Sequence, residues 1–136
     1  MRTETRGRAR VLQALYAWDI RRDEPLDRIA ERIWDDLLVP ADERRFAGFL
    51  LRILLDQGPE IDVELTDITT NWRLERLGAI ERSVLRLAAA ELRQGETPPR
   101  VVIQEAVRLA ERYGTARSAK FVNGIIDALA RRMGRI

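Results

Sequence analysis

Histidine and cysteine are both absent from the 136 residues of this chain. Without cysteine there is no disulfide framework and no thiol chemistry. Without either residue, the common zinc sites, nucleophilic dyads built on cysteine or histidine, and histidine acid–base catalysis are excluded. The glycines are scattered, and none forms a GxGxxG or GxxxxGK(S/T) phosphate loop. These absences argue against an enzyme and predict no cofactor.

Carboxylates remain as candidates for metal binding. Glu31 and Asp35 lie four residues apart in a predicted helix, where two such side chains share one face. Arg28 and Arg32 lie in the same helix. We therefore interpret the two acids as exposed and partly paired, and the sequence predicts no metal site.

Long hydrophobic runs are absent as well. Residues 11–20 are too short for a signal peptide or a membrane span, and Gln13 and Asp19 interrupt them. We expect a cytoplasmic protein that does not contact a membrane. The hydrophobic fraction of 46% and the charged fraction of 34% are those of an ordinary globular protein. The length predicts one domain, over residues 1–136.

Alternating strand patterns are essentially absent, whereas apolar residues recur at helical spacing along most of the chain. The spacing and the breakers predict a compact all-α domain of six to seven helices, orthogonal or bundle-like, with short connections. The first predicted helix ends before residues 23–25. Further helices are predicted over 26–38, 40–58, 60–70 and 79–93, with a short turn of helix at 71–77. The last two predicted helices lie on either side of Gly114.

Several residues predict where these helices begin and end. Gly58-Pro59 is expected to stop the third helix, and Gly95 the helix that starts near residue 79. Thr97 is the expected N-cap of the next helix, with prolines in its first turn, and Ser118 that of the last. The first helix is expected to bury Leu12, Leu15, Tyr16 and Ile20, and the second Leu26, Ile29, Ile33 and Leu37, with Trp34.

Asn123-Gly124 is an unusual pair for the last helix. It normally indicates a turn, yet apolar residues recur at helical spacing on both sides of it. Glycine within a helix costs roughly 1 kcal/mol relative to alanine. The simplest compensation is another backbone packed closely against Gly124, which we therefore expect.

Charge is distributed unevenly, although the net charge is only +2. The first ten residues contain four arginines and one acid, and residues 56–67 contain five acids and no base. Such a molecule can hold a polyanion on one side only. Arg2, Arg6 and Arg10 are spaced four apart and form one basic ridge on a helix, whereas Arg8 falls on another side.

Tyr16 follows this ridge in the same helix. It is either a core aromatic with its hydroxyl at the surface or a platform for a base. Single-stranded RNA is recognised by stacking and by exposed base edges. Aromatic side chains beside arginines are the parts that this recognition requires, and this helix offers them.

Four segments of the chain resemble one known family. They are RARVLQALYAWD at 8–19, WRLERLGAIERSVLRLAAAEL at 72–92, PRVVIQEAVRLAERYG at 99–114 and SAKFVNGIIDALA at 118–130. Together they closely resemble the transcription antitermination factors of the NusB family, all-helical RNA-binding proteins. The resemblance implies binding of a single-stranded RNA element called boxA in nascent ribosomal transcripts, together with NusE, a small-subunit ribosomal protein. It also implies an indirect association with other Nus factors and RNA polymerase.

The resemblance also implies which residues contact RNA. It places the N-terminal arginines on phosphates, and Tyr16 stands in the ALY motif that the family shares. The alternative for Phe121 is core packing, for Asn123 a buried amide bridging two helices, and for Arg86 a structural clamp between helix ends. The residues implied to bind RNA are Arg2, Arg6, Arg8, Arg10, Tyr16, Arg86, Lys120, Phe121 and Asn123.

A second surface is implied for the protein partner. Glu81 matches an acidic family position suited to a basic ribosomal protein, Glu75 lies nearby, and Tyr113 is a plausible neighbour. The alternative for Glu81 is an exposed acid at a helix start. Arg117 stands where some family members are acidic, which reverses the local charge.

Three rival functions follow from the same sequence. Related domains occur at the N-terminus of certain rRNA cytosine methyltransferases, but this chain has no cysteine and no catalytic domain follows before Ile136. A homodimer is the second rival, since Leu37, Leu38 and Val39 with Trp34 form either an exposed patch or ordinary core. A DNA-binding helical domain is the third, and no helix carries the polar cluster that major-groove reading needs.

Overall fold

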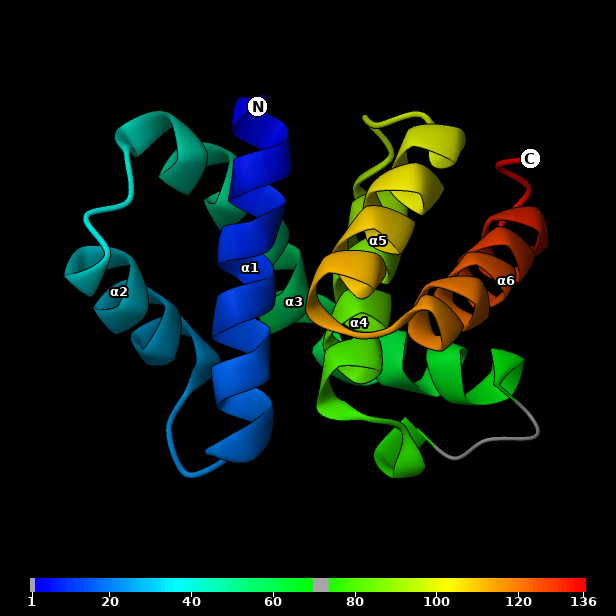
Figure 1. Ribbon diagram of the computed structural model, residues 1–136, viewed down its shortest axis with the longest axis horizontal. Coiled ribbons are helices and arrows are strands. Elements are labelled where there is room, and N and C mark those ends of the chain that lie inside the picture. The colour runs from blue at the N-terminus through cyan, green and yellow to red at the C-terminus, as the bar shows by residue number, and fades with distance from the viewer. Residues whose placement is uncertain (1, 70–73) are drawn as a thin grey trace.

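A computed structural model describes residues 2–69 and 74–136, which are helical throughout apart from short connections (Figure 1). The all-α prediction is confirmed. No helix in the described part of the chain is both long and apolar enough to cross a bilayer. The elements are α1 (Thr3–Ile20), α2 (Leu26–Asp36), α3 (Ala41–Ile68), the 3-10 turn η1 (Leu74–Arg76), α4 (Ala79–Gln94), α5 (Pro99–Tyr113) and α6 (Ala116–Arg132).

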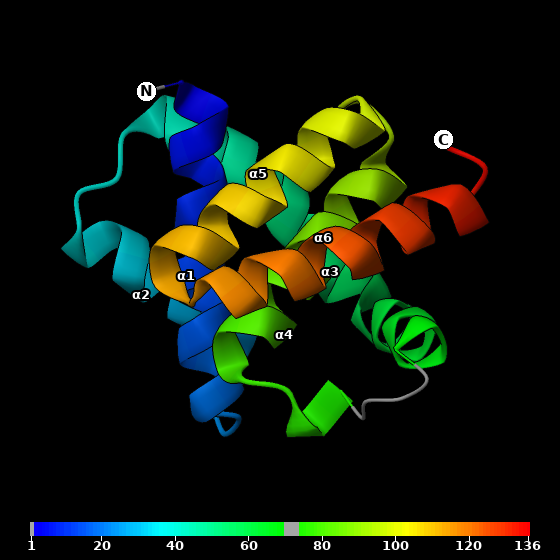
Figure 2. The same ribbon diagram turned by 45° about the vertical axis from the view of Figure 1, so that its right-hand side comes forward.

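Helix α4 lies at the centre of the molecule. It packs against α1, α3, α5 and α6, and every residue from Ser83 to Leu92 is buried. Its three consecutive alanines, Ala88 to Ala90, are buried and let neighbouring helices approach closely. α1 stands between α2 and α5, and α5 and α6 run side by side in both views (Figures 1 and 2).

Helix α3 departs from the sequence prediction at Gly58-Pro59. The expected stop is a kink at Gln57 (φ −124°, ψ 17°), after which the helix resumes. Proline has no N–H to donate, which breaks the hydrogen-bond ladder at this point. The segment after the kink remains helical because Ile61 and Leu65 continue the buried face. The predicted fourth helix is therefore the second half of α3.

The predicted helix ends are partly confirmed. Gly95 adopts a left-handed conformation (φ 83°) and ends α4 as expected. The predicted short turn is present over Leu74–Arg76, and its first residues, 71–73, lie outside the described residues. Thr97 does not cap α5, because its hydroxyl donates to Glu91 Oε2 at 2.7 Å. Thr115 is the N-cap of α6 and Ser118 is its reciprocal partner in a capping box.

Two predicted apolar faces were wrong at their ends. Tyr16 is 40% exposed and Ile20 62% exposed, so the buried face of α1 does not include them and consists of residues nearer the N-terminus. Leu37 is 50% exposed, whereas Trp34 is buried as predicted. The buried residues of α1 are Thr5, Gly7, Arg8, Val11, Leu12, Ala14 and Leu15.

The expectation for Gly124 was also wrong. A methyl group at this position would meet no heavy atom of the described residues within 4 Å. Asn123 beside it is exposed, so it is not a buried amide between two helices. Gly124 is thus a helical glycine that faces open space, and no contact with residues 2–69 or 74–136 compensates for its low helix propensity.

Candidate nucleic-acid interface

Arg6 and Arg10 are held side by side on α1 by one buried carboxylate. Glu43, at the start of α3, is 3% exposed and accepts from Arg6 Nε at 2.8 Å and from Arg10 Nε at 3.1 Å. One buried carboxylate thus holds two guanidinium groups side by side. The side chains of Arg6 and Arg10 remain 39% and 25% exposed.

Gly7 explains how α1 comes so close to Glu43. A methyl group at this position would lie 2.7 Å from the Phe46 ring and 3.4 Å from the Glu43 carbonyl oxygen. Only a residue without a side chain lets α1 pack so closely on α3 here. Trp34 fixes the same region from α2, since its indole N–H donates to the Arg10 carbonyl at 3.1 Å.

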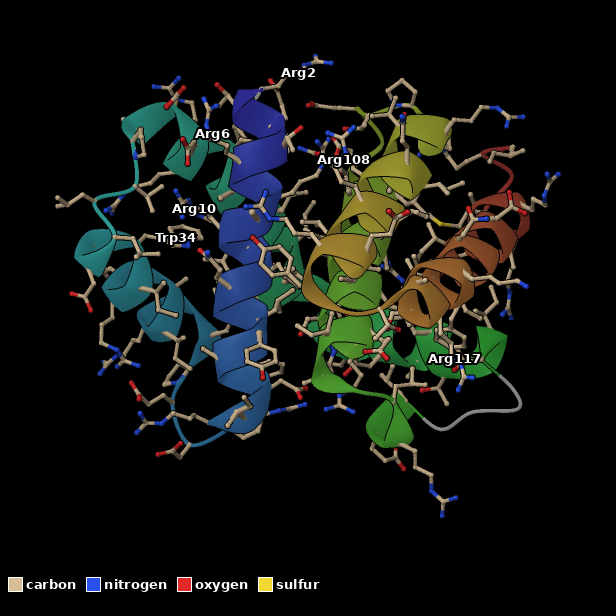
Figure 3. The ribbon with its side chains drawn as sticks, viewed as in Figure 1. Arg2, Arg6, Arg10, Trp34, Arg108 and Arg117 are labelled. Carbon is tan, nitrogen blue, oxygen red and sulfur yellow. The ribbon has the colours of Figure 1, made fainter. Side chains whose placement is uncertain are left out.

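Arg2 extends the ridge into solvent. Its side chain is 85% exposed and lies 3.8 Å from Glu4, an exposed pair that contributes little to stability. Figure 3 shows Arg2, Arg6 and Arg10 in succession along the N-terminal half of α1. The structure therefore brings the three predicted ridge residues together, with Tyr16 exposed farther along the same helix.

Arg8 points in the opposite direction, into the protein. It is 4% exposed and joins α1 to α4 and α5 through Glu91 and Glu105. Burial alone would lower the pKa of Arg8, but hydrogen bonding to Glu91 and the charges of both acids outweigh it and raise the pKa. These contacts give Arg8 a structural role, and its guanidinium is not part of the exposed ridge.

Arg86 is also buried, at the other end of α1. It donates to Asp19 at 3.0 Å and to Asp62 at 2.9 Å, and Arg82 donates to the same Asp19 carboxylate. Burial would raise the pKa of Asp19, but the two guanidinium groups outweigh burial and lower it. Arg86 therefore clamps α1, α3 and α4 together, which is the structural alternative considered for this residue.

The α6 residues divide between two sides of their helix. Lys120 and Asn123 border a shallow groove of about 510 Å³ between α5 and α6. Phe121 instead lines a smaller hollow of about 210 Å³ with Glu81 and Arg117. The structure thus separates Phe121 from its two neighbours, although all three are close in sequence.

The hollow beside Phe121 is lined by two of the four residues implied for a protein partner, Glu81 and Arg117. Ser118 Oγ donates to Glu81 Oε1 at 3.3 Å, which ties the start of α6 to the start of α4. Glu75 is exposed on the neighbouring turn η1, and Tyr113 is 38% exposed at the end of α5. Arg117 lies far from Arg2 in Figure 3, so the ridge and the hollow are distinct regions.

Sequence reasoning missed the acids that organise these basic residues. Glu43 follows Pro40 and Asp42, and acids in this position are typical of an ordinary helix start. Glu91 and Glu105 interrupt apolar faces of α4 and α5, which was the available signal for buried partners. Their shared partner Arg8 is 83 residues from Glu91 and 97 from Glu105 in the chain, so spacing alone does not connect them.

Comparison with known proteins gives a consistent result. A family model described as the NusB family matches residues 5–131. The transcription antitermination protein NusB of Solibacter usitatus is 36% identical over 135 residues, which cover 98% of this chain and 92% of the relative. That of Salinibacter ruber is 41% identical over 129 residues, covering 90% of this chain and 78% of the relative.

Solved structures agree with the sequence relatives. NusB of T. maritima superimposes with a TM-score of 0.85 at 37% identity, covering 94% of this chain and 90% of that chain. A chain from the crystal structure of the antitermination factors NusB and NusE in complex with dsRNA superimposes with a TM-score of 0.86 at 28% identity. That match covers 97% of this chain and 98% of the other.

Proposed function

The chain belongs to the NusB family of transcription antitermination proteins, a non-enzymatic family, and we propose that it binds boxA-type single-stranded RNA together with NusE. In this proposal residues 1–136 act as one RNA-binding domain in the cytoplasm. The RNA element lies in nascent ribosomal transcripts, and the complex reaches RNA polymerase through other Nus factors. Transcription then resists termination.

The observation that carries the proposal is the pair of arginines over Glu43. A buried carboxylate that fixes two partly exposed guanidinium groups orients them before any ligand arrives, which lowers the entropy cost of binding phosphates. Guanidinium groups also bind phosphate in a bidentate manner. Arg2, Arg6 and Arg10 are therefore assigned to the RNA backbone, and exposed Tyr16 to a base.

Lys120, Phe121 and Asn123 supply the second set of RNA contacts in this proposal. Lys120 and Asn123 are exposed, and the amide of Asn123 can read a base edge in an unpaired strand. Arg8 and Arg86 act indirectly, because both are buried and hold α1 in place. They position the interface and do not touch the RNA.

The hollow beside Phe121 is the proposed NusE surface. Glu81 and Glu75 offer negative charge to a basic ribosomal protein, and Tyr113 offers an aromatic contact. Arg117 places a positive charge at the rim of the same hollow. We therefore expect the bound partner to present an acidic group to Arg117 beside the basic groups that meet Glu81.

The test is a salt series of binding to a fluorescent boxA-type RNA, with a scrambled RNA as a control. The triple variant Arg6→Gln, Arg10→Gln, Glu43→Gln removes the ridge without leaving a buried carboxylate unpaired. We expect weaker binding and a salt slope smaller by about 1.4, since each lost phosphate contact contributes about 0.7 for single strands. An unchanged slope would rule out the arginine ridge as the phosphate-binding surface.

A matched variant controls for net charge. Arg131→Gln, Arg132→Gln, Asp127→Asn also removes two bases and one acid, at the far end of α6. It is expected to bind RNA like the unaltered protein. Added NusE should increase the preference for the boxA-type strand over the scrambled one, and equal weak binding to both strands would overturn the proposed function.

A further inference from the structure

We propose that α5 forms a second wall of the RNA path, in which Arg108 and Arg112 bind phosphates of a strand that continues from the ridge of α1. The inference rests on the proposed function and extends it to residues outside the α1 and α6 sets. Both arginines are exposed and lie four residues apart, so they share one face of α5. Their spacing repeats that of Arg6 and Arg10 on α1.

The contacts of Glu105 place Arg108 beside the first turns of α1. Glu105 Oε1 accepts from Thr5 Oγ1 at 2.7 Å and from Arg8 Nη1 at 3.1 Å, both on α1. Its other oxygen lies 3.9 Å from Arg108 Nε. Figure 3 likewise shows Arg108 on the side of α5 that faces the N-terminal half of α1. Glu105 thus joins α5 to the N-terminal half of α1, through Thr5 and Arg8 and not through the ridge arginines.

Arg108 is available to an external anion. Its side chain is 56% exposed, and the single ion pair that it makes is long. Exposed pairs of this kind contribute at most about 1 kcal/mol, so exchanging Glu105 for a phosphate costs little. Glu105 keeps its hydrogen bonds from Thr5 and Arg8 after such an exchange.

Arg112 continues the wall by one helical turn. Among the residues that the structure describes, no carboxylate lies within ion-pair distance of Arg112, and its guanidinium is found over the Tyr113 ring at 5.6 Å. The two arginines are separated by about 6 Å along the axis of α5, a spacing that suits neighbouring phosphates of an extended strand. Glu111, the acid next to Arg112 in the sequence, lines the groove shared with α6.

The experiment compares Arg108→Gln, Arg112→Gln with Arg131→Gln, Arg132→Gln, which makes the same change in charge at the far end of α6. Each protein is titrated with a boxA-type RNA and with the same RNA extended at either end by uridines, across a salt series. We expect the α5 variant to lose about tenfold in affinity for an extended RNA and about 1.4 in salt slope. The α6 variant is expected to change neither.

The outcomes separate the two proposals. If the α5 variant retains the affinity and slope of the unaltered protein while the Arg6, Arg10, Glu43 variant loses both, the inference is overturned and the proposed function stands. If the unaltered protein does not prefer boxA-type RNA, both proposals fail.

Arg112 lies at the C-terminal end of α5, where a base also stabilises the helix. If Arg112 had only this structural role, its replacement would lower the unfolding temperature and leave the salt slope of RNA binding intact.

Discussion

Arg8 and Glu91 form a bidentate ion pair inside the protein. Nε of Arg8 donates to Oε1 of Glu91 at 2.8 Å and Nη2 donates to Oε2 at 2.6 Å, and the two side chains are 5% and 2% exposed. The pair joins α1, which carries the exposed arginine ridge, to the central helix α4. Phe46 covers the guanidinium at 5.1 Å. The orientation of the ridge therefore depends on a contact that is buried inside the protein.

Removing Arg8 is expected to destabilise the protein without changing its interaction with phosphates. Arg8→Ala leaves Glu91 buried and uncompensated, which costs about 3–5 kcal/mol. Arg8→Lys cannot reproduce the planar fork and should also be destabilising. The measurements are urea unfolding and, below the unfolding transition, the salt slope of RNA binding, which should match that of the unaltered protein. A reduced slope would show that Arg8 contacts RNA directly.

A double-mutant cycle separates the pair from its surroundings. Arg8→Ala with Glu91→Ala should cost clearly less than the sum of the two single changes, because no lone charge is left between the two partners. Additive losses would mean that the two side chains contribute independently and that the pair does not join α1 to α4.

Asp19 is expected to make stability depend on pH in the acid range. Its pKa is lowered from the ordinary 3.8, so the folded state binds this proton less readily than the unfolded state. The resulting stabilisation is fully present above 3.8 and is lost as the pH falls through the lower, folded-state pKa. Asp19→Asn should cost about 3 kcal/mol at neutral pH, since Arg82 and Arg86 lose their shared acid. The difference from the unaltered protein should shrink below the ordinary pKa, as measured by chemical unfolding at a series of pH values; a constant difference would contradict this assignment.

Leu38 is expected to be replaceable by glycine with a gain in stability. It has a positive φ of 52° and is 84% exposed, an unfavourable combination for a leucine after a helix end. Glycine adopts this conformation without steric cost, so Leu38→Gly should stabilise the monomer by about 1 kcal/mol. Thermal unfolding of a dilute sample measures this effect, with Leu37→Gly as a control that should destabilise.

The same variant tests the homodimer as an alternative function. Leu37 and Leu38 are exposed, whereas Trp34 and Val39 are buried, so the apolar patch is limited to the two leucines. If this patch mediates self-association, Leu38→Gly should shift the molecule towards the monomer in sedimentation experiments. We expect no shift, and a clear one would favour the homodimer.

The helices were predictable because local chemistry determines them. Most helix boundaries are indicated without knowledge of the fold, by the spacing of apolar residues, by Gly95 and by the residues around 114–118. The continuation of α3 beyond the kink at Gln57 was not predictable, because Gly58-Pro59 is a strong local signal for the end of a helix. The buried contacts of Ile61 and Leu65 override it, and these depend on distant helices.

The direction of each arginine was the harder part. Arg6, Arg8 and Arg10 alternate along one short segment, yet two face the surface and one faces the core. The separation of Arg8 from the ridge follows from helical geometry, but its burial follows from Glu91, which is distant in the chain. Exposed residues such as Lys120 and Asn123 carry no packing signal, and their role rests on family membership and on experiment.

Gly124→Ala is expected to raise the stability of the protein and to weaken its binding of RNA. A methyl group would meet no atom within 4 Å in the part of the chain that the structure describes, and alanine is favoured over glycine in a helix by about 1 kcal/mol. The unfolding temperature should therefore increase by several degrees. Gly124 lies beside Asn123, on the surface proposed to meet RNA, and the added methyl group should hinder close approach of a ligand there. We expect weaker binding of boxA-type RNA by a more stable protein.

The control for this experiment is Ala128→Gly, which reverses the change one turn later on the exposed side of α6. It should lower stability by about the same amount and leave RNA binding unaltered. Unchanged binding by Gly124→Ala would mean that no ligand approaches the helix backbone at this point. A loss of stability in Gly124→Ala would instead contradict the open surroundings of the glycine.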